Sequence, residues 1–389
     1  IIEDGLFNDE YIKKQTSGFD DLRRHLKNYP PEIMEEQTGI DATLIREVAH
    51  LYAKTNKGII FWGMGVSQHV HGTDNARCLI SLALMTGNVG RRGSGLHPLR
   101  GQNNVQGASD AGLIPMMYPD YQLVEKNDKK DFFEKFWDAP LDDKKGLTVV
   151  EIMDAIHENT IKGMYILGEN PAMSDPDLNH AREALQMLEH LVVQDIFLTE
   201  TATYADVIFP ASAWPEKNGT ATNTNRQVQM GRKAIDAPGA AKEDWWITNE
   251  LGKRMDLDWK YEHPSEIYEE MSKTMPSLNN ITWDRLENEN SVTYPSRSPT
   301  TPGDEIVFGD KFPNETGRGK FVPASVTSPN EVPDEEFQMI LTTGRQLEHW
   351  HTGAMTRKAS NLDAIEPEAT VSISPNEILK RNMKPGDKI

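Results

Sequence analysis

The chain of 389 residues carries 60 acidic and 41 basic side chains, which give a formal net charge of -19 at pH 7. This length is enough for two or three domains, and the acidic balance argues against a phosphate-backbone partner such as DNA. The composition, 37% hydrophobic and 26% charged, is typical of a soluble globular protein, and no apolar run approaches the roughly 20 residues that span a bilayer.

The chain contains one cysteine, Cys78. It therefore holds no internal disulfide, no zinc site built from cysteines and no iron–sulfur cluster on its own thiolates. The first residues, IIEDGLFNDEY, include neither an initiator Met nor a signal peptide, and the last, MKPGDKI, lie in a predicted strand and turn. We therefore expect an internal piece of a longer polypeptide.

The first hundred residues alternate between helix and strand. Residues 41–55 are predicted as a helix capped by Asp41, because their apolar residues recur at helical spacing. The apolar run KGIIFWGMG at 57–65 predicts a strand and a Gly-Met-Gly turn. Residues 74–88 predict a second helix that ends near Gly87. This order is typical of an open α/β sheet.

The same alternation returns between residues 163 and 213. Strands are predicted at the start of GMYILGENPAMSD, LVVQDIFLTETA and ADVIFPASA, with an amphipathic helix over 178–191. The polar loops 63–68, 168–174 and 194–201 all follow predicted strands. Ligands of open α/β sheets bind at the carboxyl ends of the strands. The loops therefore favour an extended, polar, phosphate-bearing ligand.

The second half of the chain is less regular. Residues 215–245 are predicted as a surface loop, and 255–335 as a partly irregular connection with one clear helix near 265–275. From 336 the pattern indicates β structure at 336–345 and again from 369. We expect an α/β fold of open, mostly parallel sheets flanked by helices in two domains, followed by the start of a C-terminal β-barrel. The expected domain ranges are 1–102, 103–245, 246–335 and 336–389.

Several polar motifs have both a functional and a structural interpretation. The G-x-G at 63–65 is a nucleotide-binding turn or a simple tight turn, because it lacks the third glycine of the dinucleotide fingerprint. His69, His71 and His97 are interpreted as solvent-facing rather than as metal ligands, because no carboxylate completes a ligand set. Cys78 is interpreted as a small buried residue of its helix.

Two segments point more strongly to a binding site. LRGQNNVQGASDAG, at 99–112, follows no apolar period, and its Arg100 can hold a small carboxylate through two parallel N–H bonds. The neighbouring amides can bond a cofactor or each other; they are Gln102, Asn103, Asn104 and Gln106. GRQLEHWHTGAMTR, at 344–357, is either a solvated loop anchored by its Trp or a partner for pyrophosphate and a flat heterocycle.

With these motifs, the chain resembles the catalytic α subunit of molybdenum- or tungsten-dependent formate dehydrogenases. Those enzymes are molybdopterin oxidoreductases that carry two pterin guanine dinucleotides. The resemblance is carried, in chain order, by WGMGVSQ, TGNVGRRGSGLHPLRGQNNVQGASDAG, YPDYQ, GENPAMSDPD, VVQDIFLTETATYADVIFPASAW and TTGRQLEHWHTGAMTR. RGQNNVQG is its specific part, because related nitrate and sulfoxide reductases differ there.

The resemblance implies a role for each matched residue. Arg100 is similar to the arginine that orients formate beside the metal. Strand-end amides and hydroxyls would bind phosphates, acids would bind guanine N–H groups, and Arg345 would bind pyrophosphate. The implied cofactor contacts are Met64, Gly65, Gln68, Gly101, Gln102, Gly168, Glu169, Asn170, Ser174, Gln194, Asp195, Thr199, Asp244, Arg345, Gln346, His349, Trp350, His351 and Thr352.

The implied activity is the oxidation of formate to carbon dioxide, or the reverse, on bis-molybdopterin guanine dinucleotide with molybdenum or tungsten. Electrons would leave through iron–sulfur clusters to NAD or another acceptor on an electron-transfer subunit or domain, in the cytoplasm. The family's cysteine or selenocysteine ligand and its iron–sulfur segment precede everything seen in this chain. No metal ligand is therefore assigned here, and the piece alone is expected to be inactive.

Three alternatives remain beside the formate dehydrogenase interpretation. One is a sister oxidoreductase acting on another small anion. Another is a non-catalytic scaffold with the same fold, like the large molybdopterin-type subunit of respiratory complex I. The third, a plain nucleotide-binding module, is disfavoured by the weak G-x-G and by a resemblance that runs along nearly the whole chain.

Overall fold

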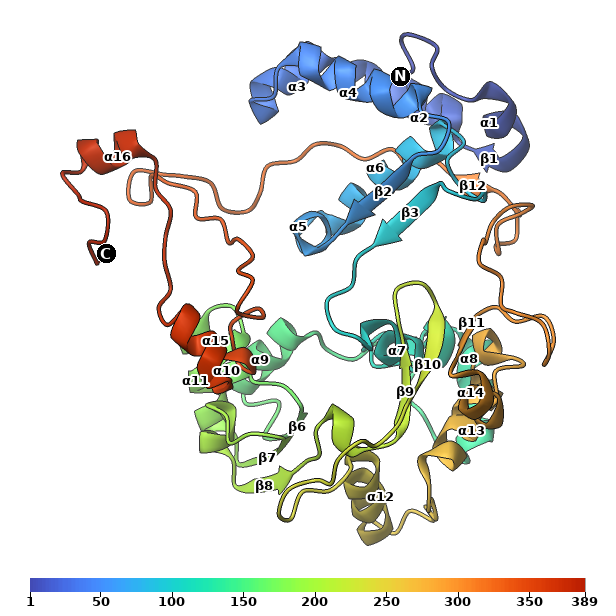
Figure 1. Ribbon diagram of the computed structural model, residues 1–389, viewed down its shortest axis with the longest axis vertical. Coiled ribbons are helices and arrows are strands. Elements are labelled where there is room, and N and C mark those ends of the chain that lie inside the picture. The colour runs from blue at the N-terminus through green and yellow to red at the C-terminus, as the bar shows by residue number, and fades with distance from the viewer. Residues whose placement is uncertain (389) are drawn as a thin grey trace. The chain divides into compact units, whose positions relative to one another are not determined.

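The computed structural model describes residues 1–388 (Figure 1). The chain forms two compact units, each assembled from three stretches of sequence. Unit 1 consists of Ile1–Gly146, Trp214–Asp236 and Thr248–Gln338, and unit 2 of Leu147–Ala213, Ala237–Ile247 and the chain from Met339 onward. The four sequential domain ranges given above stay a prediction.

The first part of unit 1 is a group of helices around one apolar core. The helices are α1 (Asp9–Gln15), α2 (Phe19–His25), α3 (Pro31–Thr38), α4 (Ala42–Lys54), α5 (Met64–Ser67) and α6 (Gly72–Met85). Ile12, Leu22, Leu84 and Phe321 are buried together in the core. Phe321 reaches it because β12 (Gly319–Lys320) pairs in parallel with β1 (Thr16–Ser17).

The two helices predicted in this part are confirmed as α4 and α6. The carboxylate of Asp41 accepts N–H groups of the first turn of α4, and Gly87 follows α6 with a positive φ of 69°. The prediction for Cys78 was wrong, because this residue is exposed. The end of α6 buries Leu84 and Met85 instead.

The second part of unit 1 contains an antiparallel sheet in the order β11–β10–β9. β9 (Gly219–Thr222) and β10 (Gln227–Gly231) form a hairpin, and β11 (Ser291–Thr293) pairs with β10. The Asn223 side chain accepts the N–H groups of Asn225 and Gln227 and so closes the turn. The prediction of a loop over 215–245 was therefore wrong for the two strands, residues 219–222 and 227–231.

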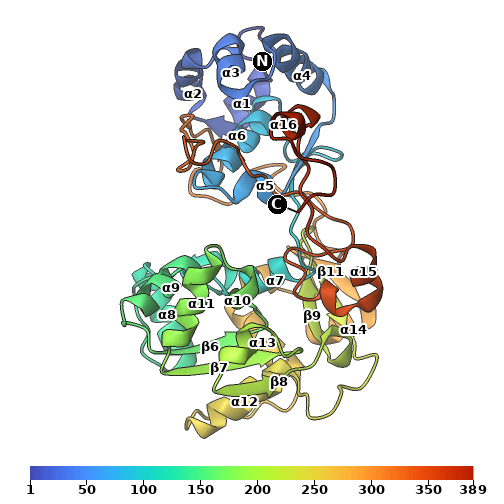
Figure 2. The same ribbon diagram turned by 90° about the vertical axis from the view of Figure 1, so that its left-hand side faces the viewer.

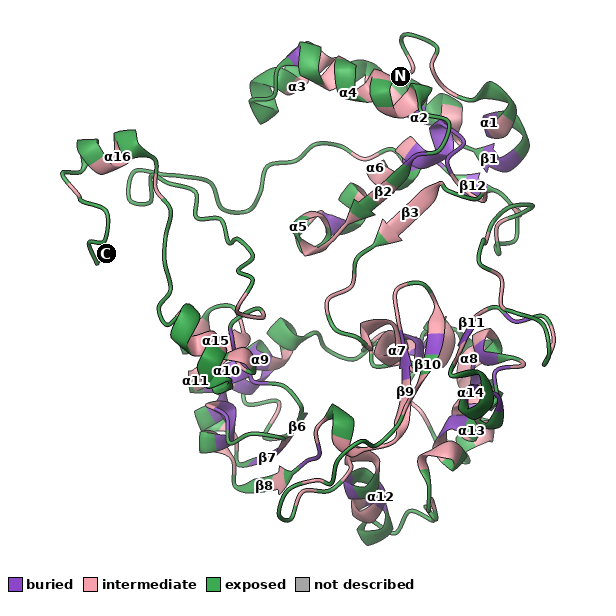
Figure 3. Cartoon of the chain, in the orientation of Figure 1, coloured by how far each residue is buried: buried purple, intermediate pink, exposed green. Residues whose placement is uncertain are grey.

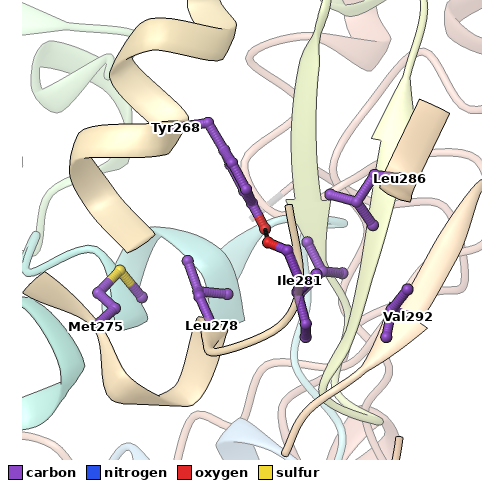
Figure 4. Close-up of a cluster of buried hydrophobic side chains, with 7 residues drawn as sticks. Tyr268, Met275, Leu278, Ile281, Leu286 and Val292 are labelled. Atoms are coloured by element: carbon purple, nitrogen blue, oxygen red, sulfur yellow. Dashed lines mark hydrogen bonds between the residues drawn. The ribbon is translucent and has the colours of Figure 1, made fainter. Parts of the chain in front are cut away.

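Helices α13 (Pro264–Thr274) and α14 (Trp283–Glu289) pack against this sheet; α13 confirms the helix predicted near 265–275. Figure 4 shows their buried contacts, which involve Tyr268, Met275, Leu278, Ile281, Leu286 and Val292. The remaining elements of this part are α7 (Val105–Asp110), β4 (Met117–Tyr118), β5 (Gln122–Leu123) and α8 (Asn127–Trp137). Phe133 of α8 is fully buried and stacks on Tyr118.

Unit 2 is built on a parallel sheet in the order β6–β7–β8. The strands are β6 (Gly163–Leu167), β7 (His190–Asp195) and β8 (Val207–Pro210), as the sequence predicted. Figure 2 shows α9 (Val149–His157) and α11 (Leu178–Met187) over one face of this sheet. Leu185 of α11 packs there with Ile166, Leu191 and Val193. Because the strands are parallel, their carboxyl ends share one edge.

The end of the chain differs from the sequence prediction. Residues 336–388 contain the helices α15 (Ser360–Ile365) and α16 (Pro375–Lys380) and no strand in the described structure. Strands predicted at 336–345 and from 369 are therefore absent from this range, and most of it is exposed (Figure 3). A strand needs a neighbour for its N–H and C=O groups, and the described chain pairs none with these residues. The barrel itself stays a prediction.

None of the helices within residues 1–388 combines the length and apolar character needed to cross a membrane.

Candidate functional site

The segment that carries Arg100 leaves a strand edge in unit 1. β2 (Ile59–Trp62) and β3 (Gly95–Pro98) pair in parallel, with Trp62 opposite Pro98. The Leu99 N–H extends the ladder to the Trp62 carbonyl over 2.7 Å. The chain therefore enters α5, with Met64 and Gly65, at the same edge at which it turns into Arg100.

Arg100 is half-buried, and its guanidinium has no carboxylate partner among residues 1–388. Its backbone N–H reaches the Thr224 hydroxyl, at 3.4 Å, in the turn between β9 and β10. Its Nε–H is buried and meets no acceptor in the described structure. A buried N–H without an acceptor costs about 1–3 kcal/mol, so the side chain is suited to an anion that supplies one.

The amides around Arg100 divide into two groups. Gln102 and Asn103 are exposed. The Asn104 side chain instead accepts the Thr222 N–H of β9 at 2.9 Å, and the Gln106 amide donates to Asp110 at 2.6 Å. The sequence left open whether these amides bond a cofactor or each other. Asn104 and Gln106 form their hydrogen bonds within the protein. The other contacts that the resemblance implies here are Gly101, which is half-buried, and Gln68, which is exposed at the end of α5.

A polar cluster around a buried carboxylate, behind this loop, was missed by the sequence prediction. Asp110 is only 3% exposed, and its two carboxylate oxygens accept hydrogen bonds from Tyr294 at 2.9 Å and from Gln106 at 2.6 Å. The Gln106 amide also approaches the Tyr121 hydroxyl at 3.3 Å. Burial raises the pKa of the Asp110 carboxyl, and hydrogen bonds from Tyr294, Gln106 and Tyr121 offset only part of that rise.

This elevated pKa predicts how Asp110→Asn depends on pH. A carboxyl whose pKa is higher in the folded state stabilises the fold below its unfolded pKa of 3.8 and loses that stabilisation as pH rises through its folded pKa. The variant cannot ionise, so its stability deficit relative to wild type is expected to shrink from pH 4 to pH 7. Thermal denaturation across this range measures the deficit, with Asp128→Asn at an exposed carboxylate of α8 as the control. A deficit that grows with pH would contradict the prediction.

In unit 2, one amide joins the loops after β6 and β7. Asn170 is buried, and its carbonyl oxygen accepts the N–H of Thr201 at 3.1 Å and its hydroxyl at 2.8 Å. Its amide donates to Glu200 at 2.8 Å, which lowers the pKa of that carboxyl. The Asn170 side chain therefore holds the two strand-end loops together. Gly168 and Glu169, in the first of these loops, are exposed.

The end of β7 presents two acidic side chains. Gln194 is fully buried; its carbonyl oxygen accepts from the Tyr165 hydroxyl and its amide donates to Asp244, at 2.7 Å, at the start of α12 (Asp244–Arg254). Burial raises the pKa of Asp195, and the nearby charge of Asp244 adds to the rise. Thr199 is also buried, and its hydroxyl accepts the Ala202 N–H at 3.2 Å.

The C-terminal loop folds on itself through a histidine. His349 contacts the Thr356 hydroxyl at 3.2 Å and the Glu366 carbonyl at 2.6 Å, and Trp350 and His351 lie edge to face at 4.9 Å between ring centroids. Thr352 contacts Ser174 through a 2.8 Å hydroxyl pair, and both residues belong to unit 2. The structure thus brings together predicted site residues 178 positions apart. Two others, Arg345 and Gln346, are exposed.

Histidines near the first loop are engaged locally. His69 contacts the Gly65 carbonyl at 2.7 Å, and the His97 ring lies 5.4 Å from that of Phe61. Within the described residues, no group of three His, Cys, Asp or Glu side chains is arranged to hold a metal ion.

Parallel strands with polar loops at their carboxyl ends, in both units, define an α/β protein with the strand-end edges at which such sheets bind ligands. The sequence profile of the molybdopterin oxidoreductase family matches residues 12–254, and that of the molydopterin dinucleotide binding domain matches residues 339–389. The chain belongs to the molybdopterin oxidoreductase family.

Its relatives include α subunits of formate dehydrogenases. It is 43% identical to the F420-dependent formate dehydrogenase subunit alpha of Methanocaldococcus jannaschii, over 100% of this chain and 58% of the relative. It is 40% identical to the F420-dependent formate dehydrogenase 2 subunit alpha of Methanococcus maripaludis, over 100% and 57%. The chain thus spans a little over half the length of these relatives.

The fold is also similar to a solved structure. Acetylene hydratase from Pelobacter acetylenicus superposes with a TM-score of 0.72 at 17% identity, covering 100% of this chain and 57% of the other. An identity this low supports the shared fold alone. The family and the relatives' names agree with the expectation drawn from RGQNNVQG and the other motifs.

Proposed function

We propose that this chain is part of a molybdenum- or tungsten-dependent formate dehydrogenase and supplies the residue that binds formate. The observation that carries the proposal is Arg100, which follows a strand end with a buried Nε–H that lacks an acceptor and with no carboxylate partner in the described structure. Formate is the smallest carboxylate, and a guanidinium can hold it through two parallel hydrogen bonds. The relatives' names point to the same substrate.

The donors and acceptors in unit 2 fit a guanine dinucleotide. Asp195 and Asp244 offer carboxylates at the end of β7 for guanine N–H groups, and Ser174 and Thr352 offer paired hydroxyls. The exposed Arg345 has a charged, planar guanidinium, which can bind the oxygens of a pyrophosphate through two parallel hydrogen bonds. The resemblance adds the remaining cofactor contacts named above, in both units. When bound, bis-molybdopterin guanine dinucleotide supplies a metal centre that accepts two electrons.

The chain's own residues would act by binding and orientation. Arg100 would hold the two oxygens of formate, so that the C–H bond has one fixed direction. The positive charge of Arg100 would keep negative charge on these two oxygens during the oxidation. Orientation and preorganised charge are worth most in a site that excludes water. Electrons would leave through a partner subunit or another domain, since the relatives are named as α subunits. We place the complex in the cytoplasm.

Metal and pterin analysis tests the cofactor assignment. We expect the purified full-length protein to contain about one molybdenum or tungsten atom and two pterins per chain, measured by ICP mass spectrometry and by fluorescence of the oxidised pterin. Removal of the metal with a chelator is expected to abolish formate oxidation. A full-length protein that contains no pterin would contradict the proposal and favour the scaffold alternative. Activity with nitrate or a sulfoxide, but not with formate, would favour a sister oxidoreductase.

A further inference from the structure

We propose that the polar cluster formed by the buried Asp110 with Gln106, Tyr121 and Tyr294 positions Arg100 for its anionic substrate by fixing α7 and the loop before it. This inference rests on the proposed function only in its choice of formate as the substrate. Asp110, Tyr121 and Tyr294 act through Arg100 and are therefore positioning residues. No role in the binding of the cofactor is assigned to them.

The cluster ties together three segments of unit 1, the third of which is far from the other two in sequence. Asp110 and Gln106 belong to α7, Tyr121 ends the short helical turn Pro119–Tyr121, and Tyr294 follows β11. Tyr294 donates to one oxygen of Asp110 across a sequence separation of 184 residues. The bond from Gln106 lies within α7, so the Tyr294 bond is the one that opposes rotation of the helix: a turn of α7 would break it and leave the buried Asp110 oxygen without a donor.

The loop before α7 transmits this constraint to Arg100. The Val105 N–H bonds the Gln102 carbonyl at 3.5 Å, which closes the chain onto the start of α7. Asn104 accepts the Thr222 N–H at 2.9 Å, and Arg100 donates its backbone N–H to Thr224 at 3.4 Å. The loop is thus anchored to one hairpin at two points, and it is held at its two ends by β3 and by α7.

Close packing leaves α7 little room to shift along that hairpin. A Cβ placed on Gly107 would lie 2.1 Å from the Asn104 Oδ1 atom and 3.2 Å from the Thr222 backbone nitrogen. The glycine is therefore required for the approach of α7 to β9. A movement of α7 would have to break the bond between Asn104 and Thr222 that supports the loop.

Arg100 and the cluster also lie within electrostatic range. Burial raises the pKa of the Tyr121 hydroxyl, the charge of Asp110 raises it further, and the charge of Arg100 lowers it. The other charges that face the cluster are Asp120, which acts on Asp110, and Arg226, which acts on Tyr294. The charge of Arg100 therefore acts on one member of the cluster, Tyr121. The cluster and the loop bonds thus act on the same side chain.

Tyr294→Phe tests the proposal, with Tyr268→Phe as a matched control. Both tyrosines belong to unit 1, Tyr268 buried and Tyr294 half-buried, and both lose one hydroxyl donor, but Tyr268 donates to the Ile281 carbonyl at 2.9 Å within the apolar cluster of Figure 4. In the full-length holoenzyme, we expect Tyr294→Phe to raise KM for formate about tenfold, with kcat changed less than twofold. Loss of one hydrogen bond to a charged group is of this order. The metal content should stay at the wild-type level.

Amide hydrogen exchange of the peptide that covers residues 99–110 provides a second measurement that needs no turnover. We expect faster exchange in Tyr294→Phe than in wild type and in Tyr268→Phe. Asp110→Asn should act in the same direction, because the amide offers one acceptor oxygen in place of two and so cannot accept from Tyr294 and Gln106 through separate oxygens. If neither variant changes exchange or KM beyond the Tyr268→Phe control, the positioning role is overturned. If wild type does not oxidise formate, the proposed function fails, while the exchange data still decide whether the cluster holds the loop.

Discussion

Arg100→Lys is expected to lower kcat/KM for formate by about 100-fold in the full-length holoenzyme. The fork of an arginine donates two parallel hydrogen bonds to a carboxylate, whereas the ammonium of lysine is a point charge that lacks the Nε donor. Here the Nε–H is the group that is buried without an acceptor in the described structure. Loss of one charged hydrogen bond costs about 1.5–3 kcal/mol, and 2.7 kcal/mol corresponds to roughly 100-fold in rate.

Steady-state kinetics with formate, normalised to metal content, measure this loss. Arg92→Lys is the matched control: it lies in the same part of unit 1, its side chain is 85% exposed, and it pairs with Glu305 only at 3.9 Å. The control should retain wild-type kinetics, because exposed ion pairs contribute little. Equal kcat/KM values for Arg100→Lys and wild type would rule out Arg100 as the formate-binding residue.

The elements predicted correctly are those whose signals are local. α4 has a capping Asp41 and an apolar residue spacing typical of a helix within 14 residues. β6 and β7 are short apolar runs followed by polar loops, and α11 between them is an amphipathic helix. The strand that leads into Arg100, β3, was not among those predicted; the structure shows it through its pairing with β2.

The elements missed are those decided by distant partners. The β9–β10 hairpin consists largely of Thr, Asn and Gln, with an apolar alternation only at Val228 and Met230, and its pairing is completed by β11 some 60 residues later. Asp110 is an ordinary polar residue in the sequence, and only its contact with Tyr294 makes it a buried acid. The prediction of strands near Ile340 was wrong for the opposite reason. The apolar pattern is present in the sequence, but the described chain provides no strand that pairs with these residues.

Gln194→Glu is expected to destabilise the protein by about 3 kcal/mol at pH 8 and by far less at pH 5. The substitution keeps the shape of a fully buried side chain but replaces the amide donor, 2.7 Å from Asp244, with a carboxylate oxygen. An uncompensated buried charge costs about 3–5 kcal/mol, and burial beside a second carboxylate raises the pKa of the new glutamate. Ionisation of the glutamate therefore lowers the free energy of unfolding.

The sign of the pH dependence follows from the elevated pKa. The neutral glutamic acid can donate to Asp244 as the amide does, so stability is retained below the unfolded glutamate pKa of about 4.3. It is lost as pH rises through the folded pKa, and a loss of about 3 kcal/mol corresponds to a pKa elevation of about 2 units.

Urea denaturation at pH 5 and pH 8 measures both values, relative to wild type at the same pH. Gln186→Glu provides the control, because it adds the same charge on the exposed face of α11 in the same unit and should change stability by less than about 0.5 kcal/mol at either pH. A Gln194→Glu protein as stable at pH 8 as at pH 5 would mean that Asp244 does not need the amide hydrogen bond. The end of β7 would then be loose enough to admit solvent, and its two carboxylates would not be preorganised for a guanine base.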